Sequence, residues 1–476
     1  MHDLVGAYER VNRLYQLYIK SAFPLRSQVL SDERDNLLRQ PEVLSQPPLV
    51  ETVPVYSPAG VNLSSAAAGL PAEFAGLAPL AQKLFPLNRE LYQHQWDSLR
   101  EVLSNHKDLV VTTGTGSGKT ECFLLPLLGQ LARESATWEK AGSPAPNRQW
   151  WLSSDSSRDS DNLRVSQWAH ISRPKALRAI ILYPLNALVE DQLRRLRMAL
   201  DDDTVHRWLD QQRGGNRITF GRYTGLTPVS GKETDPSRER LRKELIEIEQ
   251  QRQKILETLQ RNPNRDPDIQ YHFPRLDGGE MWSRWDMQEA PPDILITNYS
   301  MLNIMMMRSI ENNIFDSTRA WLAEADHPER EFFLIIDELH AYRGTPGTEV
   351  AYILRLLLLR LGLTPDSPKL RILTTTASLE DDDYGRKFLR EFFGRDQFAF
   401  ISGQQSTPQL GSRTSLQVYQ SAFEQFAQRV HPDRFAGAPD PNASSTQAEM
   451  EQLAALLGQA PSSGKGAEQV GDALVR

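Results

Sequence analysis

Residues 112–120 read TTGTGSGKT, in which three alternating glycines are followed by Lys119 and Thr120. Glycine backbone at this spacing can turn successive N–H groups inward, so that they form a nest for an anion. The lysine adds a cation that can reach the terminal phosphates of a nucleotide, and the threonine hydroxyl can ligate Mg²⁺. The segment therefore predicts a nucleotide triphosphate site. The alternative is an ordinary glycine turn with an incidental lysine.

This segment matches the Walker A pattern except at its first position, where a threonine replaces glycine. The apolar run DLVVTT before the glycines predicts a strand, and the apolar run after them predicts a helix, whose N-terminus adds partial positive charge. The residues predicted to bind the nucleotide here are Thr113, Gly114, Thr115, Gly116, Ser117, Gly118, Lys119 and Thr120.

A second candidate is the segment FFLIIDELHAY, residues 332–342, an apolar run that ends in adjacent acids. Mg²⁺ prefers oxygen ligands and retains most of its waters, so Asp337 at a strand end is sufficient to hold it together with Thr120. Glu338 is then placed to orient and deprotonate a water that attacks a γ-phosphate. The predicted catalytic residues are Glu338, Lys119 and Asp337. A strand that ends in solvated acids is the alternative.

Both candidates lie within a repeated pattern of short apolar runs, each followed by a turn and a helical stretch. The runs are DLVVTT, RAIILYP, RITFGRY, DILITNY, FFLIIDE and LRILTTTAS, within residues 108–378. Such runs predict a mostly parallel sheet covered by helices on both faces. Right-handed crossovers place every strand C-terminus at one edge, where open α/β sheets bind ligands.

The flanking regions have other compositions. Residues 1–84 predict an N-terminal helical arm and a Pro/Ala-rich connector, and residues 85–402 predict the nucleotide-binding domain. That domain contains inserts at about 136–175, which is polar and holds four tryptophans, and at about 229–290. In the second insert, residues 236–261 predict a helix. Residues 403–476 are rich in Gln, Ser and Ala and predict a partly disordered segment.

The 476 residues carry a net charge of −7, so a nucleic-acid partner requires a local basic surface and not a global field. The single cysteine, Cys122, lies in an apolar run and is interpreted as core, so disulfides and thiolate metal sites are excluded. No apolar run reaches membrane-spanning length, and the N-terminus lacks a signal-peptide pattern. We expect a cytoplasmic protein with no membrane partner and no structural metal.

The order of these segments resembles superfamily 2 helicases of the DEAD/DEAH-box group, most closely the large helicase-related and mitomycin-repair-type DNA helicases. TTGTGSGKT, DELH and TTTAS resemble motifs I, II and III. ILYPLNALVEDQLRRL resembles motif Ia, RYTGLTP the threonine-glycine motif, ITNYSMLNIMMMR motif Ib, and LYQHQ the Q motif. The resemblance covers about residues 85–400 and implies a RecA-like P-loop NTPase fold.

The resemblance also implies roles for matching residues. Gln95 corresponds to the glutamine that reads adenine, although it could equally be the polar face of a helix. His340 corresponds to the residue that couples the acids to Thr376, Ala377 and Ser378 of motif III, or it is simply a polar strand exit. The residues implied to contact the nucleic-acid backbone are Pro184, Asn186, Ala187, Thr224, Gly225, Thr297 and Asn298, while Leu185 stands where threonine is common.

Several other features are given structural interpretations. The arginines 194, 195 and 197 are read as a solvated helix face, with at most one binding nucleic acid. Trp282 and Trp285 are read as loop anchors in preference to base-stacking residues, and residues 305–307, three methionines, as core.

The family motor has two RecA-like lobes, and the second supplies arginine fingers to the nucleotide. No QxxGRxGR-like motif follows residue 378, so we expect the second lobe to come from elsewhere, in cis if the sequence is part of a longer chain or otherwise in trans. The expected function is the first motor lobe of an ATP-dependent helicase or translocase that uses ATP and Mg²⁺ and acts on DNA in preference to RNA. The alternative is a nucleotide-dependent interaction subunit of a repair or defence complex without unwinding activity.

Overall fold

The computed structural model describes residues 4–25, 27–40, 43–45, 55–66, 69–114, 116–144, 147–152, 164–184, 186–327, 329–342, 344–406, 450–453 and 455. It divides into two compact units, one formed by Met1–Val55 with Gln405–Arg476 and the other by Tyr56–Gln404. The first unit contains α1 (Leu4–Ala22) and α2 (Gln28–Arg39), so the helical spacing near the start of the chain is confirmed. Most of the predicted C-terminal segment lies outside the described residues.

The described part of the second unit is built on a seven-stranded sheet in which every neighbouring pair is parallel. The strand order is β10-β4-β9-β8-β5-β7-β6. The strands are β4 (Asp108–Thr112), β5 (Ala179–Leu182), β6 (Phe220–Tyr223), β7 (Ile294–Thr297), β8 (Phe332–Ile336), β9 (Leu370–Thr376) and β10 (Phe398–Ser402). All six predicted strands are therefore present. β10 is an additional strand that the sequence analysis missed, and it pairs with β4.

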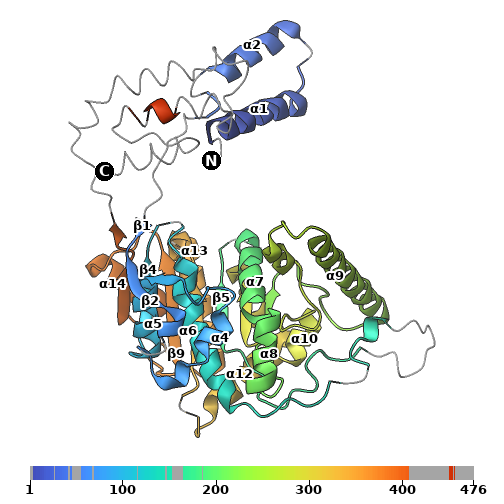
Figure 1. The fold of residues 1–476 in the computed structure, drawn as a ribbon, viewed down its shortest axis with the longest axis vertical. Coiled ribbons are helices and arrows are strands. Elements are labelled where there is room, and N and C mark those ends of the chain that lie inside the picture. Colours follow the sequence, from blue (N-terminus) through green and yellow to red (C-terminus); the bar gives the residue numbers. More distant parts are fainter. Residues whose placement is uncertain are drawn as a thin grey trace. The chain divides into compact units, whose positions relative to one another are not determined.

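Helices cover both faces of this sheet, as Figure 1 shows. Alternate strand residues enter two different cores, since side chains of a strand point to opposite faces. One face packs against α4 (Leu77–Ala81), α5 (Gln93–Leu103), α6 (Lys119–Glu134), α7 (Asn186–Leu200) and α8 (Asp203–Gln212). The other packs against α11 (Tyr299–Met307), α12 (Asn312–Ala323), α13 (Gly344–Leu361) and α14 (Asp383–Phe393). The predicted fold class is confirmed.

The boundary predicted at residue 84 differs from the observed unit, which begins at Tyr56. This stretch forms β2 (Pro58–Asn62), α3 (Leu63–Ala66), a 3₁₀ turn and α4, and β2 pairs with β3 (Glu90–Tyr92). Its apolar side chains, among them Phe74 and Leu80, are buried in the same core as α6. The Pro/Ala-rich composition concealed this role because the segment buries its few large apolar residues through short, irregular elements. The described part of β1 is Val55–Tyr56, and that of β11 is Gln405–Ser406.

The two inserts are not independent loops, because they share a small core of their own. This insert module contains the 3₁₀ turn η3 (Trp150–Leu152), α9 (Asp235–Arg261) and α10 (Arg284–Glu289), and its core includes the side chains of Trp151, Leu241 and Trp285. The helix predicted over 236–261 is thus confirmed. Residues 145–146 and 153–163 of the first insert lie outside the described residues.

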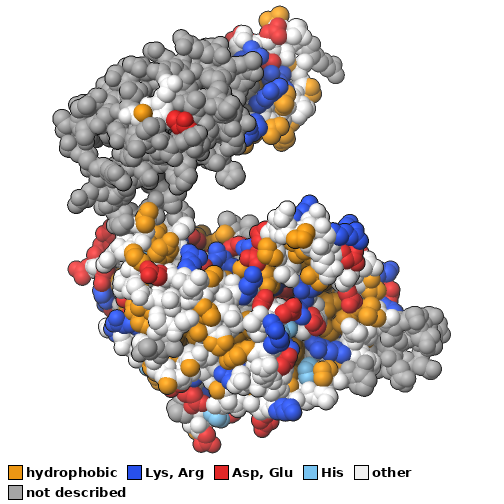
Figure 2. All heavy atoms as spheres, in the orientation of Figure 1, with side chains coloured by type: hydrophobic (Ala, Val, Ile, Leu, Met, Phe, Trp, Pro, Cys, Tyr) orange, Lys and Arg blue, Asp and Glu red, His pale blue; other side chains and the backbone are white. Residues whose placement is uncertain are grey.

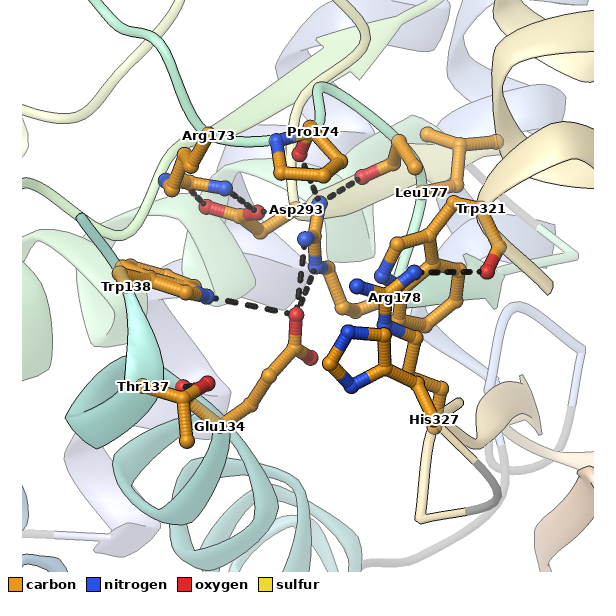
Figure 3. A network of polar contacts seen from close by, with 12 residues as sticks. Glu134, Thr137, Trp138, Arg173, Pro174, Leu177, Arg178, Asp293, Trp321 and His327 are labelled. Carbon is orange, nitrogen blue, oxygen red and sulfur yellow. Dashed lines mark hydrogen bonds and ion pairs between the residues drawn. The ribbon is translucent and has the colours of Figure 1, made fainter. Parts of the chain in front are cut away.

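A buried ionic network fastens the start of β5 to neighbouring elements (Figure 3). The Arg178 guanidinium contacts Glu134 at 2.8 Å and Asp293 at 3.1 Å, and it donates to the carbonyl of Ala176 at 2.7 Å. Arg173 holds the same aspartate through two bonds of 2.8 and 2.6 Å. Although burial opposes ionisation, the two guanidiniums lower the pKa of Asp293. The network therefore consists of charges that compensate one another.

We predict that Arg178→Gln destabilises this unit by about 3–5 kcal/mol, because it leaves buried carboxylates without their partner. Arg217→Gln is the matched control, since Arg217 pairs with the half-exposed Asp210 and such pairs contribute only about 0–1 kcal/mol. Urea unfolding followed by tryptophan fluorescence measures both. Equal losses in the two variants would contradict a stabilising role for the network.

Candidate functional site

The predicted glycine loop lies between the end of β4 and the start of α6. Gly116 and Gly118 both have φ of +76°, a conformation that favours glycine. A Cβ atom on Gly118 would lie only 2.3 Å from the Gln95 amide nitrogen, whereas one on Gly116 would meet open space. The loop is braced underneath by a hydroxyl–hydroxyl contact of 2.6 Å between Thr113 and Ser117, both buried. Exposed main chain at Gly114 and Gly116 is therefore available to a ligand, while the neighbouring side chains stabilise the loop. Thr115 lies outside the described residues.

Lys119 lies opposite the acids at the end of β8. Its ammonium contacts the Glu338 carboxylate at 3.1 Å, and the other oxygen of that carboxylate lies 3.2 Å from Nδ1 of His340. Parallel pairing in the order β4-β9-β8 brings these side chains together from positions more than two hundred residues apart. The three predicted catalytic residues, Lys119, Asp337 and Glu338, thus lie close together. Thr120 is the second residue of α6, adjacent to Lys119.

Asp337 is buried and held by a residue that the sequence analysis missed. Its Oδ1 accepts a hydrogen bond from the Thr375 hydroxyl and a second one, at 3.1 Å, from the Glu338 N–H. Burial raises the pKa of Asp337, the Thr375 hydrogen bond and Lys119 oppose that shift, and the Glu338 charge reinforces it. A nearby cation would therefore favour the ionised carboxylate.

Thr375 could have been found from strand periodicity. The sequence analysis selected Thr376, Ala377 and Ser378, which resemble motif III. The buried Thr376 hydroxyl accepts from the Ser378 N–H at 3.3 Å, while the residues at 377 and 378 are exposed. Thr375, by contrast, is on the same face of β9 as Leu373, which packs beneath the glycine loop and its helix. That alternation identifies the threonine that meets the acids.

Glu338 has a left-handed backbone, with φ of +53° and ψ of +51°. Such a conformation in a residue other than glycine costs about 1–3 kcal/mol and persists only where the surroundings enforce it. Here the Glu338 N–H is fixed by both Asp337 Oδ1 and Thr375 Oγ1, each at 3.1 Å. The local strain turns the carboxylate toward Lys119.

Gln95 and His94 hold the glycine loop from α5. The Gln95 amide accepts from the Tyr92 N–H at 3.0 Å and donates to the Gly118 carbonyl at 3.3 Å. His94 lies 2.8 Å from the Ser117 carbonyl through Nε2. Both side chains are about 1% exposed, so Gln95 is not part of a solvated polar helix face. In the structure the Gln95 side chain contacts the glycine loop, and the predicted contact between Gln95 and adenine stays a prediction.

The residues implied to bind nucleic acid gather at the same sheet edge, on β5, β6 and β7. Pro184 follows β5, and the α7 backbone begins with Asn186 and Ala187. The side chains of Asn186 and Ala187, and the whole of Leu185, lie outside the described residues. The Thr297 hydroxyl donates to the Tyr223 carbonyl at 2.7 Å. The Thr224 hydroxyl accepts a hydrogen bond from the Leu226 N–H at 3.3 Å. The Asn298 side chain caps α11 by accepting from the Met301 N–H at 2.8 Å. Gly225 is exposed. Thr224 and Thr297 are buried with their hydroxyl groups engaged, so their predicted nucleic-acid contacts stay predictions.

The arginine-rich face of α7 is engaged internally. Arg195 contacts Glu121 at 2.6 Å and Asp191 at 2.9 Å, and the buried Arg197 contacts Glu280 at 2.6 Å. The interpretation of residues 194, 195 and 197 as a solvated face is therefore wrong for Arg197, because an acid from the second insert covers it. On the face in Figure 2, basic and acidic side chains are interspersed over this unit.

Other interpretations are tested by burial. Trp282 and Trp285 are buried in the insert-module core and donate their indole N–H groups to the carbonyls of Leu276 and Gly231, which confirms them as anchors. Cys122 is buried, and burial raises the pKa of its thiol to about 12, as expected for core. Met305 is core, but Met307 is 79% exposed, so the prediction for the methionine run is wrong at its end. Consecutive helix positions face different directions.

Comparison with known proteins finds a family that matches part of the chain. Residues 92–220, which include the glycine loop, match the family described as DEAD/DEAH box helicase. The chain is 31% identical over 464 residues to the Druantia protein DruE of Escherichia coli (strain UMEA 4076-1), an alignment that covers 88% of this chain and 23% of that protein. The chain therefore spans about a quarter of the length of this relative.

Solved structures resemble this chain more distantly. The crystal structure of the DUF1998 helicase MrfA bound to DNA aligns with a TM-score of 0.39 and 18% identity, covering 74% of this chain and 29% of that one. The DEAD-box helicase Mss116 bound to ssRNA and UDP-BeF aligns with a TM-score of 0.37 and 13% identity, covering 78% and 54%. Among the described residues, no helix combines the length and apolarity needed to cross a bilayer, and no cluster of three or more histidine, cysteine or acidic side chains could hold a metal ion.

We predict that this unit loses stability as pH falls below about 6.5, the pKa of histidine in an unfolded chain. Burial lowers the pKa of His94, so the folded protein keeps it neutral while the unfolded chain takes up a proton. Burial and neighbouring cations similarly lower the pKa of His170 to about 4. Melting temperatures between pH 7.5 and 5.5 should fall less steeply for His94→Gln than for the wild type, since glutamine does not titrate. Identical slopes would rule out this role for His94.

Proposed function

We propose that residues 56–404 form the first motor lobe of an ATP-dependent helicase or translocase. The observation that supports this most directly is the meeting of Lys119 with Glu338, beside Asp337 and an exposed glycine main chain. These groups follow β4 and β8, the two strands that flank β9 in one parallel sheet. Cation, carboxylates and free N–H groups at one strand edge suit a triphosphate better than any other common ligand.

The donor set also fits ATP with Mg²⁺. The backbone of residues 113–118 and Lys119 would hold the phosphates, and Gln95 would contact adenine. The Thr120 hydroxyl and the Asp337 carboxylate would hold the magnesium ion, which prefers oxygen ligands and lessens the negative charge on the phosphates. Burial of Asp337 supports this role, because burial raises the pKa of its carboxyl and a neighbouring cation would lower it.

Glu338 would act as the base that orients and deprotonates the attacking water. In the structure its carboxylate is paired with Lys119 and His340. We propose that phosphate oxygens compete for the lysine and so release the carboxylate for the water. His340, with Thr376, Ala377 and Ser378, would then couple this site to the nucleic-acid edge formed by the strand ends of β5, β6 and β7.

We further propose that rapid turnover requires a second RecA-like lobe, from the remainder of a longer chain or from another chain. This chain spans 23% of the length of DruE, so such a lobe need not be within it. A single strand of DNA is the proposed track. A role in defence or repair is proposed from the relationship to a Druantia protein.

We predict that this chain binds ATP–Mg²⁺ and that Lys119→Ala weakens binding about 10- to 100-fold, because one charge-assisted contact contributes about 1.5–3 kcal/mol. Glu338→Gln should retain binding, since it removes the base and not the phosphate contacts, and should abolish the slow hydrolysis. Isothermal titration and phosphate release measure the two effects. Undiminished affinity in Lys119→Ala would reject the proposed site, and fast DNA-stimulated turnover by this chain alone would reject the need for a second lobe.

We also predict that Arg284→Lys weakens binding of single-stranded DNA about tenfold, roughly 1.4 kcal/mol, without changing ATP affinity. Arg284 is buried, donates to the Thr224 carbonyl at 2.6 Å and lies 5.2 Å from the Tyr223 ring centroid. Lysine keeps the charge but loses the planar fork that fixes the threonine-glycine loop.

The matched control for this experiment is Arg213→Lys. Arg213 similarly donates to a carbonyl, that of Ala132, and lies 4.5 Å from the Trp208 ring centroid, but on the α6 and α8 side of the unit. Fluorescence anisotropy of a labelled oligonucleotide at constant salt gives the affinity. If both variants bind DNA equally well, the loop geometry set by Arg284 does not contribute.

A further inference from the structure

The insert module contains a cavity of about 510 Å³ that shares no residue with the predicted nucleotide site. It lies between η3 and α9, and α9 occupies the side of the unit opposite α14 (Figure 1). Its lining includes Arg148, Gln149, Trp151, Arg252, Gln253 and Leu256. Ligand pockets for small molecules are commonly about 300–1,000 Å³, so the cavity is large enough for a nucleotide.

Two arginines on its wall form no ion pair with an acid among the described residues. Arg148 lies over the rings of Trp168 and Trp282, at 5.5 and 5.8 Å from their centroids. Arg252 donates to the carbonyl of Phe273 at 3.3 Å. Neither forms an ion pair within the described part of the chain, in contrast to the paired arginines on α7. Both guanidiniums therefore retain donors for an anion.

The acids on the same wall are already engaged. Glu249 accepts from the Trp151 indole N–H at 3.0 Å. Asp277 is held by both ends of the Arg275 guanidinium, at 2.8 and 2.7 Å. Burial opposes ionisation of Asp277, yet Arg275 lowers its pKa to about 2, so its charge is balanced by an arginine outside the cavity wall. These acids form no ion pair with Arg148 or Arg252, although the charge of Asp277 attracts both guanidiniums.

The surroundings add further positive charge. Burial lowers the pKa of His170, and the charges of Arg148, Lys175 and Arg217 lower it further, to about 4. Burial likewise lowers the pKa of Arg148 and of Arg252. The charge of Asp277 opposes both shifts, while Arg217 reinforces the one at Arg148 and Arg275 the one at Arg252. An anion placed between the two arginines would relieve this repulsion.

We propose that this cavity is a second site for a phosphate-bearing ligand of nucleotide size. The Arg148 and Arg252 guanidiniums bind the phosphate oxygens, and their planar forks suit that geometry. The Gln149 and Gln253 amides lie on the same wall, and Leu256 supplies apolar surface beside it. A free nucleotide and the phosphodiester of a nucleic-acid strand share this chemistry.

The test uses Lys119→Ala, which weakens ATP binding at the proposed strand-edge site, as the background. Isothermal titration with ATP and, separately, with a thymidine octanucleotide should show binding of at least one probe. Adding Arg148→Gln and Arg252→Gln should weaken that binding at least tenfold. Adding Arg217→Gln should leave it unchanged, because Arg217 is nearby but does not line the cavity. The probe that binds identifies the source of the phosphate.

Two results would overturn the proposal. One is no binding of either probe to the Lys119→Ala chain, and the other is equal affinity in the Arg148/Arg252 and Arg217 variants. If the double variant melts at a lower temperature, Arg252→Gln alone is used, since Arg252 is not stacked on the tryptophans and should give the same direction of loss. ATP binding at the strand-edge site is measured independently, by comparing the wild-type chain with the Lys119→Ala variant alone.

Discussion

The parallel register between β8 and β9 is the constraint on which the candidate site depends. Ile336 is paired with Thr374, so Asp337 and Thr375 are the next residues along the two strands. The hydroxyl of one therefore reaches the carboxylate of the other, and the same two atoms fix the Glu338 N–H. A slip by one residue would turn the threonine side chain to the opposite face and remove all three contacts.

From this ladder the geometry extends across the sheet to the glycine loop. β9 also pairs with β4, where Thr112 is level with Thr376, so the loop begins beside the strand that holds the acids. The Thr112 hydroxyl donates to the Leu379 carbonyl at 3.0 Å, which ties the two strand exits together. Lys119 and Glu338 can then make contact without a large movement of either strand. This geometry comes with a left-handed Glu338 and a buried Asp337 whose pKa is raised, and both are energetically unfavourable.

Sequence patterns predicted the elements that rely on local periodicity. The β-branched runs identified six strands of the sheet, and charge spacing identified α9, because each pattern is visible in one short window. β10 was missed since its short FAFIS run closely follows a helix and lies after the last predicted strand. Thr375 was missed because the motif comparison directed attention to Thr376 and its successors, and residues 56–84 because their buried side chains are few and irregularly spaced.

The joint core of the inserts could not be predicted from either insert alone. Each is polar overall, and the tryptophans that bind them together, Trp151 and Trp282, are separated by more than a hundred residues. Their ring centroids lie 4.7 Å apart only because the strands between them place both inserts at the same end of the sheet. Long-range packing of this kind depends on strand order, which local patterns do not encode.

That packing joins the insert module to the edge of the sheet proposed to bind nucleic acid. Trp282, which lies beneath the Arg148 guanidinium, is two residues before Arg284, whose side chain holds the Thr224 carbonyl. Arg164 of the first insert contacts Asp286 at 2.7 Å and thereby fixes the same short helix, α10. A phosphate bound at Arg148 would lie at one end of the buried segment that contains Trp282 and Arg284. The other end of that segment positions the threonine-glycine loop. Closely packed protein interiors have low compressibility and transmit strain. Occupancy of the cavity and the shape of that loop should therefore be linked through α10.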